Sequence, residues 1–243
     1  RLENEGVSIP NVTSSLETET LSDQTLQVLY PSHQVFLLST SALTEFYRNQ
    51  YAYFLKYVLA LQDEMTIHPD ARSHGNFLHR VFEKVMQDSS SEQFDYRLEK
   101  AIQEPSQEAE FKEIYTENAV ALFAHEVLLD TARATGLVLE KNDLVDTIQE
   151  EAVFGQEDVN FLSLSDGRKL QIRGKVDRID RLRSNNSLGI VDYKSSDTNF
   201  DFQKFFNGLN SQLPTYLAAL KQEKWADDGT QLFGAMYLQM GNP

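Results

Sequence analysis

The fold is decided by two stretches, Arg173-Gly174-Lys175-Val176-Asp177-Arg178-Ile179-Asp180 and Ile190-Val191-Asp192-Tyr193-Lys194, which a short turn separates. Apolar and polar residues alternate in the first, and the second is an apolar run that ends in charged residues, so each is typical of a β-strand. The pair Asn185-Asn186 between them favours a turn. We predict a hairpin of strands 170–182 and 188–194, with Asp177 about opposite Lys194 and diagonal to Asp192. Two carboxylates and one ammonium group then converge.

That grouping suits the hydrolysis of a phosphodiester. Two carboxylates can hold Mg²⁺ or Mn²⁺, which prefer oxygen ligands, and the backbone carbonyl of Tyr193 is placed to supply a further one. A bound metal ion lowers the pKa of its water and neutralises the charge that builds on the phosphorus. Lys194 beside it can position the attacking water or stabilise the developing charge.

The Asp-x-Lys pattern also has a simpler interpretation. Glu110-Phe111-Lys112 has a similar spacing of charges, and we expect that segment to be helical and solvated. Asp192 and Lys194 could likewise form a surface ion pair, which contributes little to stability. On the pattern alone the two interpretations are about equal. The apolar strand before Asp192 and the acidic strand that precedes it favour a functional site.

Around the hairpin, the periodicity of the apolar residues predicts an α+β domain. Residues 1–33 are polar and rich in Ser, Thr and Glu, which favours a linker or an extended arm. We expect helices from about residue 39 and over 73–86, 93–102, 107–134, 142–151 and 202–221, and strands over 159–164, 170–182, 188–194 and 231–240. A mainly helical part, 34–150, thus precedes a β-β-β-α-β core, 151–243.

Composition narrows the classes of protein. The chain has 243 residues, no cysteine and a formal net charge of -15. Disulfides, zinc sites of the cysteine type and iron–sulfur clusters are therefore excluded, and no apolar run approaches the roughly 20 residues of a membrane span. A cytoplasmic setting fits. Nucleic-acid binders usually carry a basic surface, so this acidity argues mildly against one, unless metal ions and a partner bring the strand in.

Four motifs, in this order, resemble the RecB-type branch of the PD-(D/E)XK nucleases. They are Gly75-Asn76-Phe77-Leu78-His79, Gly174-Lys175-Val176-Asp177-Arg178-Ile179-Asp180, Ile190-Val191-Asp192-Tyr193-Lys194-Ser195-Ser196 and Gln212-Leu213-Pro214-Thr215-Tyr216. The corresponding family patterns are G-x-x-x-H, G-x-x-D-R-[IV]-D, [IV]-D-[YF]-K-[ST] and Q-x-x-x-Y. The resemblance implies a restriction-endonuclease-like core and a nuclease domain over residues 34–243.

The resemblance also implies roles for individual residues. The metal ligands would be His79, Asp177 and Asp192, with Mg²⁺ as the cofactor and Mn²⁺ as an alternative. Lys194 would be the catalytic lysine. Gln212 and Tyr216 would orient the strand or the lysine. The family's acidic residue ahead of the first core strand falls at Glu150 or Glu151, and we favour Glu151. The remaining histidines, His33, His68, His74 and His125, are expected to be structural or exposed. Nearby cations that could contact backbone phosphates are Arg173, Lys175, Arg178 and Arg181.

A narrower resemblance is to the nuclease domain in the B subunit of AddAB/RexAB helicase–nucleases, and it is carried by residues 39–46, 51–59 and 232–238. Many of those subunits have a Cys-Pro pair where Asn49-Gln50 stand here, and that cysteine helps to ligate an iron–sulfur cluster. We expect a cluster-free variant, in which packing of Tyr51, Phe54 and Tyr57 substitutes for the cluster. The resemblance implies a DNA exonuclease that trims single-stranded DNA emerging from a helicase partner of the AddA/RexA type, during recombinational repair of double-strand breaks.

Three other functions are weaker. A catalytically silent nuclease-like module that binds and guides single-stranded DNA is opposed by the complete set of Asp177, Asp192 and Lys194. A structural or interaction domain would be favoured only if metal binding failed. Stand-alone RecB-like nucleases of the CRISPR-associated type carry cluster cysteines, which this chain lacks.

Overall fold

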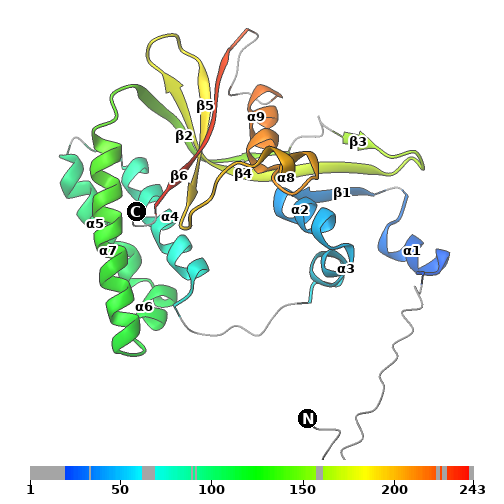
Figure 1. The fold of residues 1–243 in the computed structure, drawn as a ribbon, viewed down its shortest axis with the longest axis horizontal. Coiled ribbons are helices and arrows are strands. Elements are labelled where there is room, and N and C mark those ends of the chain that lie inside the picture. Colours follow the sequence, from blue (N-terminus) through cyan, green and yellow to red (C-terminus); the bar gives the residue numbers. More distant parts are fainter. Residues whose placement is uncertain are drawn as a thin grey trace, which may run out of the picture.

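The computed structural model describes residues 20–32, 34–61, 69–88, 90, 92–156, 161–222, 225 and 229–240. Its helices are α1 (Asp23–Leu29), α2 (Thr40–Arg48), α3 (Gln50–Tyr53), the π-helical turn η2 (Phe54–Val58), α4 (Ala71–Gln87), α5 (Phe94–Gln107), α6 (Ala109–Thr116), α7 (Ala119–Glu140), α8 (Phe202–Phe206) and α9 (Gln212–Gln222). Its strands are β1 (Val35–Ser39), β2 (Val145–Phe154), β3 (Phe161–Ser163), β4 (Lys169–Leu182), β5 (Leu188–Lys194) and β6 (Leu232–Gln239). The predicted α+β architecture, with a helical half before most of the sheet, is confirmed (Figure 1).

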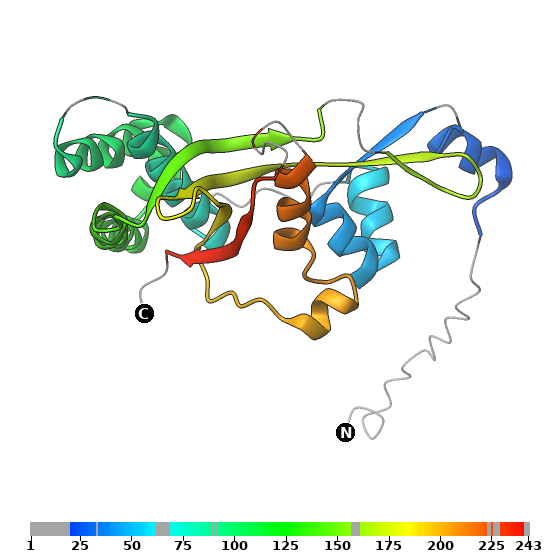
Figure 2. The same cartoon turned by 90° about the horizontal axis from the view of Figure 1, so that it is seen from above.

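Strand β4 organises the sheet because it is long enough to take different partners along its length. Residues 169–173 pair in parallel with β1, and residues 169–171 pair antiparallel with β3. Residues 174–182 pair antiparallel with β2, while β5 joins the other edge antiparallel and β6 extends β5 in parallel. The predicted hairpin of two adjacent strands is therefore confirmed, and Figure 2 shows β4 running the length of the sheet.

Helices cover both faces of this sheet. The core on one face joins α4–α7 to β5, and its members include Phe77, Phe82, Tyr115, Val191 and Tyr193. The core on the other face joins α9 to β2, β4 and β5, and its members include Phe154, Val176, Ile190, Tyr216 and Leu220. Successive residues of a strand point to opposite faces. Tyr193 therefore turns toward α4, and Asp192 turns toward α9, which lies on the far side of the sheet from the helical half (Figure 1).

The segment 142–151 was predicted to be helical, and that prediction is wrong. Most of it belongs to β2, which pairs with β4 from Leu182 back to Gly174. The local sequence carries the β-branched residues Val145, Thr147 and Ile148, which favour a strand. The decisive factor is tertiary: β4 offers a second edge whose N–H and C=O groups need partners, and β2 satisfies them.

Two long predicted helices are each divided in the structure. Region 107–134 holds α6 and α7, and the side-chain oxygen of Asn118 caps α7 by accepting hydrogen bonds from the N–H groups of Val120 and Ala121, both at 3.0 Å. Region 202–221 holds α8 and α9. Gly208 between them has a φ of 76°, a left-handed conformation that suits glycine, and a Cβ there would collide with the Tyr47 ring.

The N-terminal part of the domain was only partly predicted. Helix α1 lies within the segment expected to be a linker, of which residues 1–19 and 33 lie outside the described residues, and β1 was not predicted. Helix α2 starts at Thr40 as expected, because the hydroxyl of Ser39 accepts a hydrogen bond from the N–H of Ala42 at 3.1 Å. No helix in the described part of the chain is long and apolar enough to cross a membrane.

Asn49, which stands where the resemblance led us to look for a cysteine, caps a helix. Its side-chain oxygen accepts hydrogen bonds from the N–H groups of Tyr51 and Ala52 at 3.0 and 3.1 Å, which caps α3. Tyr57, one of the aromatic residues expected to pack here, stacks on Tyr53 with ring centroids 5.5 Å apart. Tyr51 was expected to pack as well and does not, since it is 70% exposed.

Candidate active site

Helix α4 carries His79 to the end of β5. The helix begins with a capping box, in which the Asp70 carboxylate accepts from the N–H of Ser73 at 2.7 Å and the Ser73 hydroxyl accepts from the N–H of Asp70 at 2.8 Å. One turn before His79 stands Gly75, where a Cβ would lie 3.0 Å from the hydroxyl oxygen of Ser195. The missing side chain thus lets α4 approach the segment that follows β5.

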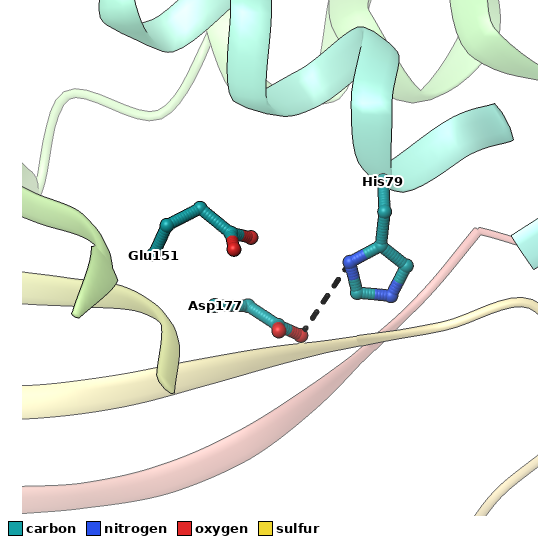
Figure 3. Close-up of side chains that lie close together, drawn as sticks. All are labelled: His79, Glu151 and Asp177. Carbon is teal, nitrogen blue, oxygen red and sulfur yellow. Dashed lines mark ion pairs between the residues drawn. The ribbon is translucent and has the colours of Figure 1, made fainter. Parts of the chain in front are cut away.

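The imidazole of His79 has a different neighbour at each ring nitrogen. Nδ1 lies 3.8 Å from Oδ2 of Asp177, as marked in Figure 3, and Nε2 lies 3.2 Å from the carbonyl oxygen of Tyr193. A carbonyl only accepts, so we assign the proton to Nε2, which leaves the Nδ1 lone pair free. Burial lowers the pKa of His79 and so favours this neutral form. Histidines that bind metals commonly donate their second N–H to such an acceptor.

Glu151 enters the site through an unusual backbone conformation. Its φ is 50°, which is uncommon for a residue other than glycine and interrupts the regular alternation of side chains along β2. One of its carboxylate oxygens pairs with the ammonium group of Lys175 on the neighbouring strand. Figure 3 shows the Glu151 carboxylate turned toward Asp177 and His79, and one ligand atom from each of these three residues lies within 4.8 Å of the others.

The two aspartates lie on neighbouring strands and affect each other. Oδ2 of Asp177 accepts a hydrogen bond from the N–H of Tyr193 at 2.7 Å. Burial raises the pKa of Asp177, although this hydrogen bond opposes the rise. Burial, followed by repulsion from Asp177, raises the pKa of Asp192 to about 6, while Lys194 acts in the opposite direction. The site therefore concentrates negative charge that a cation would stabilise.

Lys194 is held by two groups. Its Nζ lies 2.5 Å from Oδ2 of Asp192 and donates to Oε1 of Gln212 at 3.0 Å. The amide nitrogen of Gln212 donates to Oδ1 of Asp192 at 2.8 Å and to the hydroxyl of Tyr216 at 3.1 Å. Gln212 and Tyr216 stand one turn apart on α9, so both reach the end of β5 from the same helix face. The network leaves the ammonium group in one defined position.

The group formed by His79, Glu151 and Asp177 fits a hard divalent cation. Two carboxylates and one neutral imidazole supply oxygen and nitrogen donors, and carboxylates are the preferred ligands of Mg²⁺ and Mn²⁺. Asp192, predicted as a ligand, instead directs both carboxylate oxygens to Gln212 and Lys194 in this structure. The Tyr193 carbonyl, also predicted as a ligand, faces His79. Their roles as metal ligands stay predictions.

The structure brings together most of the predicted residues, with a corrected register. Arg178 pairs with Val191, so Asp177 lies about opposite Asp192 and not, as predicted, opposite Lys194. Of the two candidate glutamates, Glu151 belongs to the cluster. The side chain of Glu150 is half-buried near Arg178, and burial raises its pKa to about 8.

Arg178 corrects a further expectation, since it was proposed to contact phosphates. It is 4% exposed, and its guanidinium donates to Asp180 at 2.8 Å and to the hydroxyl of Tyr193 at 3.1 Å. The remaining carboxylate oxygen of Asp180 accepts from the Thr147 hydroxyl at 2.9 Å. This buried network ties β2, β4 and β5 together beneath the site, and it leaves Arg178 out of reach of a ligand.

Two of the four remaining histidines lie in the described part of the chain. His74 and His125 stack on Tyr115 inside the helical half, as expected for structural residues, whereas His33 and His68 lie outside the described residues.

Two contacts at the site were not predicted from the sequence. They are the pairing of Lys175 with Glu151 and the close approach of Ser195 to Gly75. The sequence signal for the second contact is a glycine one turn before His79.

Comparison with known proteins identifies the family of the chain. A sequence profile described as the PD-(D/E)XK nuclease superfamily matches residues 37–243. The chain is 58% identical over its whole length to the B subunit of the ATP-dependent helicase/deoxyribonuclease of Streptococcus pneumoniae strain CGSP14 and to the exonuclease/helicase subunit RexB of its serotype 4 strain ATCC BAA-334 / TIGR4. It is 46% identical to the corresponding B subunit of Streptococcus mutans serotype c. It covers 22% of the length of each of these relatives.

Proposed function

Because the chain belongs to the PD-(D/E)XK nuclease superfamily, we propose that it is a metal-dependent deoxyribonuclease domain that cuts single-stranded DNA. The observation that carries this proposal is the pairing of two sets of groups at the end of β5. His79, Glu151 and Asp177 form a ligand cluster, and Lys194 stands beside it, held by Asp192 and Gln212. A metal site beside a fixed cation is suited to phosphodiester hydrolysis, because both stabilise the charge that develops on the phosphate.

The metal ion is Mg²⁺ in this proposal, with Mn²⁺ as the alternative, and His79, Glu151 and Asp177 hold it. Its chemistry when bound is to acidify water and to offset the negative charge of the phosphate. The protein contributes orientation: the Tyr193 carbonyl accepts from Nε2 of His79, and the Tyr193 N–H donates to Asp177. Both contacts come from one residue's backbone, so the strand that carries Lys194 also aligns two ligands.

Lys194 acts on the phosphate in this account. Its ammonium group donates hydrogen bonds to a non-bridging phosphate oxygen or to the attacking water, and it is preorganised because Asp192 and Gln212 already hold it. Gln212 is a positioning residue, since its amide joins Lys194, Asp192 and Tyr216 in one network. Tyr216 fixes the amide orientation from the next turn of α9.

The names of the relatives extend the proposal to a larger assembly. They denote the B subunit of an ATP-dependent helicase/deoxyribonuclease, and this chain spans about a fifth of their length. We infer that a helicase of the AddA/RexA type delivers single-stranded DNA to this domain in the cytoplasm, during recombinational repair of double-strand breaks. A partner that supplies the basic surface is consistent with the net charge of -15.

The test is cleavage of end-labelled single-stranded DNA in Mg²⁺, in Mn²⁺ and in chelator, by the wild type and by the variants Asp192→Ala and Lys194→Ala. Lys112→Ala, an exposed change on α6 outside the network, is the control. The proposal expects metal-dependent cutting that Asp192→Ala and Lys194→Ala abolish and Lys112→Ala retains. If the wild type binds the strand without cutting it, also in the presence of its helicase partner, the domain is a guiding module.

A further inference from the structure

A cleft of about 330 Å³ adjoins the candidate active site on the side of α9. Its walls come from α2, η2, the start of α9 and the ends of β5 and β6. Lys194 and Gln212 belong both to this cleft and to the network around Asp192. A ligand that reaches Lys194 can therefore continue into the cleft without a break.

The charges that line the cleft are the reverse of the charge on the chain as a whole. Arg48, Lys56 and Lys194 face it, and among the described residues that line it Glu45 is the only carboxylate. Glu45 lies 3.6 Å from Arg48, whose side chain is 64% exposed. Such an exposed pair is weak, so an anion in the cleft can draw the guanidinium away from Glu45 at little cost. In a chain with a net charge of -15, this local excess of cations favours an anionic ligand.

Two helix starts add neutral donors. Thr40 and Ser41, in the first turn of α2, line the cleft, and so does Ser211, directly before α9. The N-terminal turn of a helix carries free N–H groups and partial positive charge, which together favour phosphate. The buried hydroxyl oxygen of Ser211 has no hydrogen-bond partner within the described protein, and an unsatisfied buried polar atom is unfavourable unless a ligand or water completes it.

We propose that this cleft binds a phosphodiester of the DNA strand next to the one that is cut. The proposal rests on the proposed function, because it takes the scissile phosphate to lie at Lys194. Arg48 and Lys56 then contact the neighbouring phosphate, and the hydroxyl groups of α2 and the N-terminus of α9 provide further donors. Contacts of this kind carry no sequence information, so they hold any strand in register for cutting.

The experiment compares two double variants that remove the same charge. Arg48→Ala with Lys56→Ala changes the cleft. Arg133→Ala with Lys141→Ala changes positions outside the cleft, since Arg133 pairs with Glu99 from the second half of α7 and Lys141 is the exposed residue after that helix. Binding of two fluorescent single-stranded oligonucleotides, one with hydroxyl ends and one with a 5′-phosphate, is measured by anisotropy, with Ca²⁺ in place of Mg²⁺ to limit cutting. Cleavage is measured separately in Mg²⁺, and melting temperatures verify that each variant folds.

The proposal expects the cleft variant to bind the oligonucleotide at least roughly tenfold more weakly than the wild type. The slope of the logarithm of the binding constant against the logarithm of the salt concentration should become shallower by about 0.7 for each lost phosphate contact. In cleavage its KM rises while kcat stays within about twofold, since bound strand still meets Lys194. The conservative exchange Arg48→Lys with Lys56→Arg retains most of the binding. The variant at Arg133 and Lys141 behaves like the wild type.

Equal binding by both double variants, with a wild type that cuts, overturns the cleft proposal alone. A loss confined to oligonucleotides with a 5′-phosphate also overturns it and assigns the cleft to a terminal phosphate. A wild type that binds single-stranded DNA but never cuts it overturns the proposed function. The comparison of binding by the two double variants then still tests whether the cleft holds the strand. A wild type that binds no single-stranded DNA contradicts both.

Discussion

The Nε2 atom of His79 lies 3.2 Å from the backbone carbonyl oxygen of Tyr193, the residue between Asp192 and Lys194. This contact links the helical half of the domain to the strand that carries the catalytic lysine of our account. It also determines which ring nitrogen of His79 is free to bind a metal ion.

Replacing His79 should weaken metal binding. We expect His79→Ala to lower the affinity for Mn²⁺ about 100-fold, because a ligand of the cluster is lost and the nearby carboxylates remain. Titration calorimetry measures the affinity. His125→Gln is the matched control, since His125 is packed against Tyr115 away from the cluster. Equal losses in both variants would show that stability, and not ligation, explains the effect.

The adjacent pair Glu150 and Glu151 offers a sharper comparison. Glu151→Gln should lower Mn²⁺ affinity at least about tenfold, because its carboxylate belongs to the cluster. Glu150→Gln should leave that affinity unchanged, since the same chemical change falls on the side chain near Arg178. The reverse result, with Glu150→Gln as the damaging change, would assign the family's acidic position to Glu150.

Gln212 should matter for the rate and little for binding. Its amide positions Lys194 and Asp192, so Gln212→Ala should lower kcat about 10- to 100-fold and change KM only a few-fold. Steady-state cleavage of single-stranded DNA separates the two constants. Gln203→Ala, at an exposed position of α8, is the control and should match the wild type. A change in KM alone would assign Gln212 to strand binding.

The close approach of Gly75 and Ser195 predicts a suppressor. Even a single Cβ at Gly75 would lie 3.0 Å from the Ser195 hydroxyl oxygen, so the larger Gly75→Val side chain should push α4 away from the end of β5. Because this moves His79, the rate of cleavage should fall about tenfold or more. Adding Ser195→Gly should restore part of the activity because it removes the side chain in contact. No restoration in the double variant would mean that Gly75 is required for another reason.

The two stacked histidines of the helical half predict a dependence of stability on pH. Burial is the main cause that lowers the pKa values of His74 and His125 in the folded state, so the unfolded chain takes up protons first as the pH falls. The stability they contribute is complete above about pH 6.5 and is lost as the pH falls through their lowered folded values. Urea unfolding is measured at pH 7, 6 and 5. Over this range the free energy of unfolding should fall more steeply for the wild type than for the double variant His74→Gln with His125→Gln. Parallel curves would contradict this.

The strands around the site could be predicted from the sequence because their signals are local. β4 alternates, β5 is apolar on both faces because its residues enter two cores, and Asn185-Asn186 marks the turn between them. The family motifs then identified residues whose side chains the fold brings together, including His79 on a distant helix.

The rest of the site depends on long-range geometry. The register of the hairpin differs from the predicted one by two residues, which leaves every side chain on the same face, so the pattern cannot distinguish the two. The positive φ of Glu151 depends on β2 pairing with β4, and β2 itself was taken for a helix. Arg178 looked like a phosphate contact because charge is visible in a sequence, whereas burial beneath Tyr193 is not.

The most direct test of the account is single-turnover cleavage of single-stranded DNA by Asp177→Asn at saturating Mn²⁺. The change is isosteric and keeps an oxygen that can accept from the Tyr193 N–H, so the fold and the strand position should survive. Loss of the charge at the centre of the cluster should reduce the cleavage rate about 1,000-fold or more, with a melting temperature close to that of the wild type. Cleavage at the wild-type rate would contradict the assignment of this cluster as the active site.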